Sequence, residues 1–376
     1  MAEFSTKRFL VPIKSGTWAS NTTGLKYVIE RQDRRLMDLR LIMNVTLASI
    51  ANGTATAKLD GLLKNVNVKL SDKAGDSRSV FNQGSSTLLH WQRKHLGKLA
   101  ARTQLNVMGQ YTDGTYDVGI IIPFVHPLAA TPGRWAQSVP LWKKDADGNG
   151  LASDIEVTID TSAIASQDMG LNTGTVSYNS VRLYATMAMI DQSLSAANKL
   201  GYVPMALQTQ DFDPSSASSN AKFSLAEDGY LTSLLFEQFI SNTTGVRGTT
   251  LTTPASDFFN LEYKGGVIDT LTPAERILED ELWNDSIPTD AVPLQLAHAG
   301  GDYSATNSNA NLFAHNFWHN SALGEARRLN SCPNLYTGGN SGDILRVCPS
   351  NVAANTRLRL TAHKFMTQDP AALAGQ

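Results

Sequence analysis

Alternation of apolar and polar residues dominates the chain and predicts strands. In residues 39–47, LRLIMNVTL, every second residue is Leu, Met or Val. A period of two places alternate side chains on opposite faces of a strand, so one face of this segment is expected to be buried. Similar patterns, or short apolar runs of strand length, predict further strands at 64–70, 118–125, 155–161, 181–190, 230–240, 258–263, 292–298, 344–348 and 356–365.

Only two segments have helical periodicity. Residues 85–100 begin with a serine N-cap, and residues 272–285 begin with a capping box of Thr272 and Glu275, with Pro273 at the first helical position. Their apolar stripes consist of Leu88, Trp91, His95, Leu96 and Leu99 in the first helix, and of Ala274, Ile277, Leu278 and Leu282 in the second.

The order of these elements repeats along the chain. Each half opens with a long amphipathic strand, continues through a second strand and one helix, and closes with a long alternating strand. A polar connector at 211–222 lies early in the second half. This weak repeat of roughly 190 residues predicts an all-β chain of two tandem sandwiches, with domains at 1–195 and 196–376.

Composition narrows the function classes. The 376 residues carry a net charge of −2, which argues against a basic surface for nucleic acid. Charged residues make up only 18 %, which favours outer surfaces that are partly covered by other molecules. No apolar run reaches transmembrane length, and the N-terminus has no secretory pattern, so we expect synthesis in a cytoplasm.

The segment DADGNGLASDIE, residues 145–156, matches a calcium loop. Asp145, Asp147 and Asn149 fill ligand positions 1, 3 and 5, Gly150 fills the turn position 6, and Glu156 fills position 12. The flanks are not helical, so we do not expect a sensor that opens a helix pair. The alternative is a polar turn, which uses the same residue types.

Other candidate chemistry is weak. His315 and His319 have the spacing of a zinc helix, but Asn316 stands where a metalloprotease needs its glutamate, so packing histidines are the favoured interpretation. Cys332 and Cys348 are expected to be free thiols, although they could face each other across a hairpin. No phosphate loop, nucleophile elbow or acid pair is identified, so we predict no catalytic residues.

Two long stretches carry a resemblance to a known family. The first runs from VRLYATMAMIDQ through LGYVPMALQTQDFD to YLTSLLFEQFISNTTG, and the second from SNANLFAHNFWHN to TRLRLTAHKFMTQD. In the order and length of its features, the chain resembles the double jelly-roll major capsid proteins of tailless bacteriophages with an internal membrane, the lineage that includes phage PRD1.

This resemblance implies a fold and a function. It implies two eight-stranded jelly rolls side by side, a homotrimer with a pseudo-hexagonal outline, and trimers that tile an icosahedral virion shell over a lipid membrane. Neighbouring capsomers, penton proteins and minor capsid proteins would be the partners. The N-terminal segment would point toward the membrane, the C-terminal tail would reach neighbours, and there would be no active site.

Two other functions fit parts of the pattern. A calcium-dependent β-sandwich lectin or adhesin would use DADGNG in its sugar-binding loop, but a lectin does not need the second half. A jelly-roll hydrolase would need an acid pair or a triad, and the sequence indicates neither. At the N-terminus, the basic residues Lys7, Arg8 and Lys14 alternate with apolar ones, a pattern that could contact an anionic membrane or a neighbouring chain.

Overall fold

The computed structural model describes strands in both halves, one α-helix and one short 3-10 helix. The described residues are 8–50, 57–71, 77–96, 110–125, 138–143, 151–163, 169, 173–188, 205–217, 222–225, 229–239, 241, 259–271, 312–316, 335–337, 345–349 and 352–365. The strands predicted within these ranges are confirmed. The predicted strand at 292–298 and the predicted helix at 272–285 lie outside them.

The first half contains eight principal strands in two facing sheets, the first sandwich. One sheet has the order β1-β11-β3-β8, and the other contains β2, β10, β5 and β6 in that order. Their bounds are β1 Arg8–Trp18, β2 Leu25–Ile29, β3 Arg35–Ala48, β5 Leu63–Ser71, β6 Ser77–Gln83, β8 Gly114–Pro123, β10 Ile155–Thr161 and β11 Thr175–Ala188. Short elements complete this half: β4 Ala57–Lys58, the 3-10 helix η2 Leu59–Leu62, β7 Gln110–Tyr111 and β9 Val139–Pro140.

The second half repeats this arrangement in a second sandwich. One sheet has the order β17-β14-β20-β12 and the other β13-β19-β15-β16. The bounds are β12 Met205–Phe212, β13 Phe223–Leu225, β14 Gly229–Phe239, β15 Phe259–Tyr263, β16 Gly266–Leu271, β17 Leu312–Asn316, β19 Leu345–Pro349 and β20 Arg357–Phe365, and β18 Leu335–Thr337 also pairs with β14.

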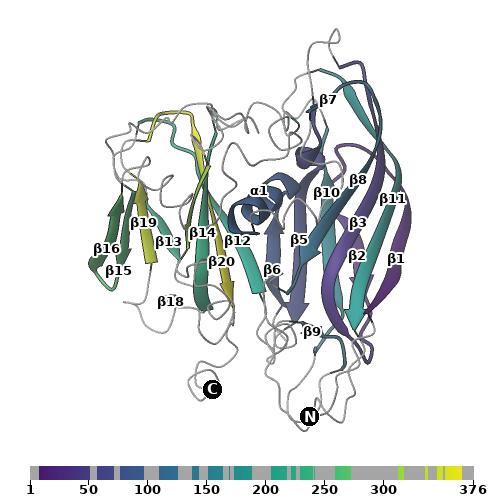
Figure 1. Ribbon diagram of the computed structural model, residues 1–376, viewed down its shortest axis with the longest axis horizontal. Helices are drawn as coiled ribbons and strands as arrows, with labels where there is room; N and C mark the ends of the chain where they lie inside the picture. The colour runs from purple at the N-terminus through teal and green to yellow at the C-terminus, as the bar shows by residue number, and fades with distance from the viewer. Residues whose placement is uncertain are drawn as a thin grey trace.

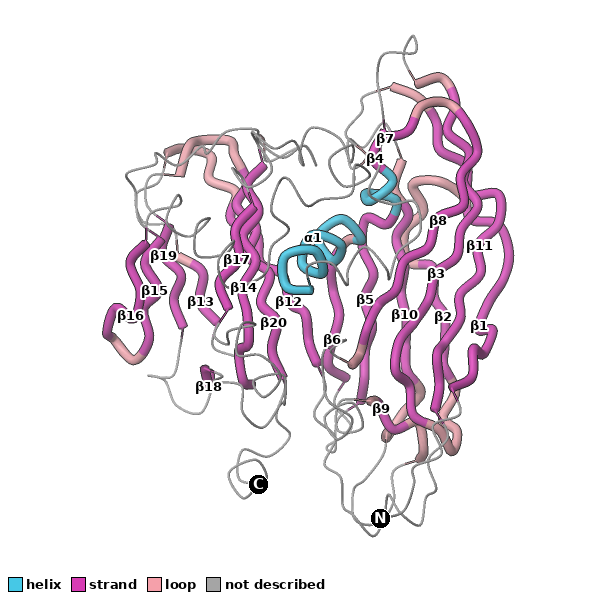
Figure 2. The backbone as a smooth tube through the Cα atoms, viewed as in Figure 1, coloured by secondary structure: helices cyan, strands magenta, loops and turns pink. Residues whose placement is uncertain are grey.

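The two sandwiches have the same topology. When the eight principal strands of each half are numbered in chain order, both halves give sheets ordered 1-8-3-6 and 2-7-4-5. This is the two-Greek-key order of a jelly roll. The halves join where β6 runs parallel to β12, with Leu207 opposite Phe81 and Gln208 opposite Asn82. One sheet therefore continues from the first sandwich into the second, as Figures 1 and 2 show.

The alternating residues form the cores. In β3, Leu39, Leu41, Met43, Val45 and Leu47 are buried, whereas the intervening side chains are half-buried or exposed. The pleat thus turns the predicted apolar face inward. A large cluster fills the first sandwich and a smaller one, around residues 223–236 and 345–362, fills the second. The predicted domain boundary at 195/196 lies between β11 and β12, outside the described residues.

The single described α-helix, α1 Ser85–Leu96, differs from its prediction in how it is buried. The sequence predicts one apolar stripe, but every side chain from Thr87 to Gln92 is buried, including His90. The physical reason is its position: α1 packs beside β5 of its own sandwich and against strands of the second (Figures 1 and 2). A helix enclosed on all sides is buried all round.

Candidate functional site

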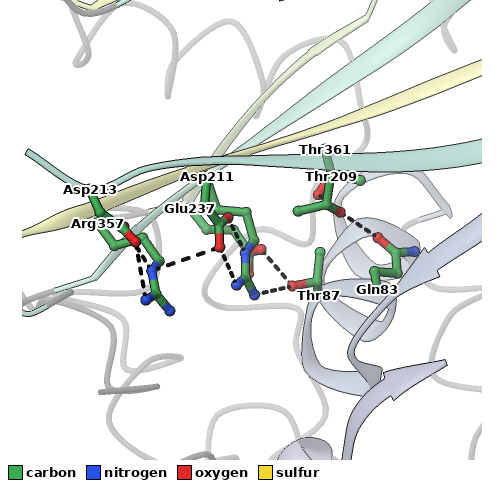
Figure 3. Close-up of polar contacts among 9 residues, drawn as sticks. Gln83, Thr87, Thr209, Asp211, Asp213, Glu237, Arg357 and Thr361 are labelled. Atoms are coloured by element: carbon green, nitrogen blue, oxygen red, sulfur yellow. Dashed lines mark hydrogen bonds and ion pairs between the residues drawn. The ribbon is translucent and has the colours of Figure 1, made fainter. Parts of the chain in front are cut away.

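Polar side chains join helix α1 to the second sandwich at the seam between the halves (Figure 3). The hydroxyl of Thr87 donates a hydrogen bond to Glu237 Oε2 on β14 at 2.9 Å, and it accepts one from Arg359 Nη1 on β20 at 3.2 Å. Thr87 and Glu237 are both buried. A buried carboxylate needs hydrogen-bond donors, so Thr87 helps to hold Glu237 in place.

Two arginines of β20 extend this cluster toward the end of β12. Arg359 binds Asp211 through two hydrogen bonds, from Nε at 2.7 Å and from Nη2 at 2.8 Å. Arg357 binds Asp213 in the same two-pronged manner, at 2.9 and 3.3 Å. These forked pairs fix the relative positions of two neighbouring strands and of the helix that Arg359 touches.

The seam also has an apolar part. The ring of Trp91, which is fully buried, lies 5.0 Å from the ring of His363 on β20, measured between centroids. Ala206, Leu207 and Leu235 of the second half belong to the core cluster of the first. Burial of Trp91 and these residues stabilises the junction by several kcal/mol in order of magnitude.

A second set of contacts fixes α1 to its own sandwich. The Leu88 N–H donates to the Gly84 carbonyl at 3.2 Å, which begins the helix. The Ser85 hydroxyl bonds instead to the backbone of Asp60 and accepts from the Leu63 N–H, so the predicted serine cap ties α1 to η2 and β5. The Ser86 hydroxyl donates to the Asp60 carboxylate at 2.9 Å.

The predicted calcium loop is described only in part. Asp145, Asp147 and Asn149 lie outside the described residues. Glu156 lies in β10, as the strand periodicity predicts, and its half-exposed carboxylate is 3.5 Å from Lys26 Nζ. Calcium binding by this loop stays a prediction; among the described residues, no group of three or more metal-ligating side chains occurs.

Asp154, inside this loop, was not predicted to have a role. Its carboxylate accepts hydrogen bonds from the backbone N–H of Arg31 at 3.0 Å and from Arg31 Nε at 2.9 Å. These contacts hold the pKa of Asp154 below its ordinary value, chiefly through the backbone hydrogen bond. Asp154 therefore anchors the start of β10 to the chain that follows β2.

The remaining candidate residues lie apart from the seam. His315 lies in strand β17, so its segment is not the helix that a zinc site with His319 would need; His319 is outside the described residues. Cys348 is a free thiol in β19, and burial raises its pKa, whereas Cys332 is outside the described residues. Within the described part of the chain, no helix is long and apolar enough to cross a membrane.

Comparison with solved structures tests the fold. A crystal structure of the STIV MCP matches with a TM-score of 0.62 and 12 % sequence identity, over 98 % of this chain and 100 % of that one. The fold is a double jelly roll. The PBCV-1 virus capsid model matches with a TM-score of 0.57 and 10 % identity, over 98 % of this chain and 96 % of that one.

The double jelly roll is also similar to the major capsid protein P2 from bacteriophage PM2, with a TM-score of 0.50 and 9 % identity over 96 % of this chain and 99 % of that one. No protein-family model matches the sequence, and a comparison with curated proteins gives no match. The predicted double jelly-roll fold is confirmed. The similar structures come from several kinds of virus, so the narrower identification of a bacteriophage protein stays a prediction.

Proposed function

We propose that the chain is the major capsid protein of an icosahedral virus and that its function is assembly. The observation that carries this proposal is the double jelly-roll fold over 98 % of the chain, shared with capsid proteins of several viruses. A double jelly-roll capsid subunit needs both sandwiches, whereas a lectin would need only one of them. The proposal assigns no catalytic residue to the chain.

The seam supports this function physically. A subunit of a closed symmetric assembly repeats the same contacts with each neighbour, so its two halves must keep one relative orientation. The continuous sheet through β6 and β12 and the contacts of α1 with Glu237 and Arg359 supply that rigidity. The low fraction of charged residues, 18 %, agrees with sides that are covered by other subunits in the shell.

The proposed assembly is a homotrimer with a pseudo-hexagonal outline that tiles a virion shell over an internal membrane. Six similar sandwiches from three chains give that outline. The basic and apolar N-terminal segment, with Lys7, Arg8 and Lys14, is proposed to face the membrane. Other capsomers, penton proteins and minor capsid proteins are proposed as neighbours, and a bacteriophage is the proposed source.

The native mass of the purified protein tests this proposal. Light scattering is expected to give about 122 kDa, three times the 40.7 kDa of one chain. A monodisperse monomer would contradict the proposal and favour the lectin.

Calcium binding is tested separately, by titration calorimetry of the wild-type protein and of an Asp147→Asn variant. If Asp145, Asp147, Asn149 and Glu156 form a calcium site, the wild type binds Ca²⁺ and the variant binds it more weakly, because the ligand set loses one carboxylate. Equal heats in the two proteins would identify the segment as a turn. Repeating the mass measurement with a chelator shows whether calcium contributes to trimerisation.

A further inference from the structure

The two sandwiches are joined by parallel pairing between one edge strand of each. The equivalent edge strand of each sandwich at the other end of the molecule has no such partner among the described residues. β6 is the fifth principal strand of its sandwich and β12 is the first of the next. The corresponding fifth strand of the second sandwich is β16, and the corresponding first strand of the first sandwich is β1. Each is the last strand of its sheet in the described part of the chain. Figures 1 and 2 place them at opposite ends of the long axis.

The residues that would pair can be identified from the internal junction. Leu207 is the third residue of β12 and lies opposite the third-last residue of β20. Leu10 is the third residue of β1 and lies opposite the third-last residue of β11, so it is equivalent to Leu207. Phe81 is the third-last residue of β6, and Asp269 holds that place in β16.

These equivalences translate the internal pairing into an external one. The pairs Leu207–Phe81 and Gln208–Asn82 become Leu10 opposite Asp269 and Val11 opposite Thr270. The internal pairing ends at Gln208. Its counterpart would end at Val11, because the next residue, Pro12, has no N–H to donate.

Within the described residues, neither β1 nor β16 has a strand on its outer side, and the two strand sequences carry opposite charges. In and before β16, Gly265, Gly266 and Thr270 are exposed and Val267 is 55 % exposed. A tight turn in which Lys264 and Gly265 both have positive φ connects β15 to β16 and keeps this hairpin short. In β1, Pro12 and residues 15–17 are exposed. The sequence of β1 contains two basic residues and no acidic one, whereas β16 contains one acidic residue and no basic one.

We infer that β16 of one chain adds in parallel to β1 of a second copy, and that this contact repeats the β6–β12 junction between subunits. Such a contact is heterologous: it joins one end of a chain to the other end of the next and closes into a ring when the rotation permits. The number of chains in this ring, three, is taken from the proposed function, on which the inference rests. It explains how one junction geometry can serve all six neighbouring sandwich pairs of a pseudo-hexagonal capsomer.

Disulfide trapping tests this contact in the full-length chain. Neighbouring strands lie about 4.8 Å apart, within the range that a disulfide spans. The test variant carries Val11→Cys and Thr270→Cys in a background in which Cys332 and Cys348 are replaced by serine. The matched control carries Ser177→Cys with Thr270→Cys, because Ser177 is an exposed strand residue on the outer face of the same sheet as β1.

After mild oxidation, the test variant is expected to run as a covalent trimer on a non-reducing gel, and reductant should return it to one chain. The cross-linked fraction should exceed that of the control by about tenfold, because neighbouring thiols react at millimolar effective concentration. Light scattering of the same samples separates the possible failures. A trimer without the cross-link would overturn this inference and leave the proposed function standing, whereas a monomer would contradict both. A ladder of species larger than three chains would overturn ring closure.

Discussion

Replacement of Thr87 by valine removes the hydroxyl that connects α1 to the second sandwich and keeps the shape of the side chain. Glu237 Oε2 then loses a donor that lies 2.9 Å away, in a site where both side chains are buried. A hydrogen bond to a charged group contributes about 1.5–3 kcal/mol, and a buried acceptor that loses its donor retains the cost of its desolvation. The link to Arg359 adds little, because that side chain is 22 % exposed and can be hydrated. We therefore expect a loss of about 2 kcal/mol, a factor of about 30 in the unfolding equilibrium.

Urea unfolding followed by tryptophan fluorescence and by circular dichroism measures this loss. Coincident transitions in the two signals justify a two-state treatment. The control is Thr209→Val, the same chemical change at the same seam, where the hydroxyl lies 3.2 Å from both the Gln83 amide oxygen and the Thr361 hydroxyl, two neutral partners in a part-buried site. The control should lose less than about 1 kcal/mol. Equal losses in the two variants would refute the reasoning that the hydrogen bond from Thr87 to the Glu237 carboxylate contributes more than a hydrogen bond to a neutral group.

Three further predictions concern single positions. Gly84→Ala should destabilise the protein by about 1–3 kcal/mol in the same urea assay, because the new Cβ would lie 2.9 Å from a backbone carbonyl oxygen of β5; an unchanged midpoint would contradict this. Asp154→Asn should lower the thermal midpoint at pH 7, and the difference from wild type should shrink as the pH falls below about 4, because a carboxyl group with a lowered folded-state pKa contributes its full stability above the unfolded value and loses it as the pH falls through the folded value; a difference that stays constant between pH 7 and pH 2 would contradict it. In a Cys332→Ser variant, Cys348 should react with Ellman's reagent more slowly at pH 8 than a free cysteine does, and faster as the pH rises, because burial raises its pKa; a rate equal to that of free cysteine would show that the thiol is accessible.

The double sandwich could be predicted because strand periodicity is a local property. The alternation from Leu39 to Leu47 decides which face of β3 is buried, whatever its neighbours are. The order of these segments, repeated twice, was enough to predict two similar halves. The resemblance to capsid proteins then supplied the number of strands in each half.

The seam could not be predicted in the same way, because it depends on which strands meet. Neither the sequence of β6 nor that of β12 indicates that the two strands pair in parallel, since they lie more than a hundred residues apart along the chain. One signal was present in β14: the run from Ser233 to Glu237 lacks a consistently polar face. All five of these side chains are buried, because one face of the strand lies in the second core and the other faces α1. A strand without alternation is typical of burial on both faces.

The helix shows the same limit. Its apolar stripe correctly predicted α1. Thr87 and His90 are buried because the second sandwich packs against the helix, and the helical period gives no indication of that contact. The role of Arg359 was also outside the reach of the sequence. It takes part in an alternating strand, TRLRLTAHKF, where an outward arginine is typical of a solvated face.

Electron microscopy of the purified oligomer tests the central claim most directly. If the chain is a capsid subunit built from two tandem jelly rolls, class averages should show a compact ring of six lobes around a three-fold axis, with the lobes alternating between the first and the second sandwich. A particle with two lobes, or an oligomer without three-fold symmetry, would contradict the account.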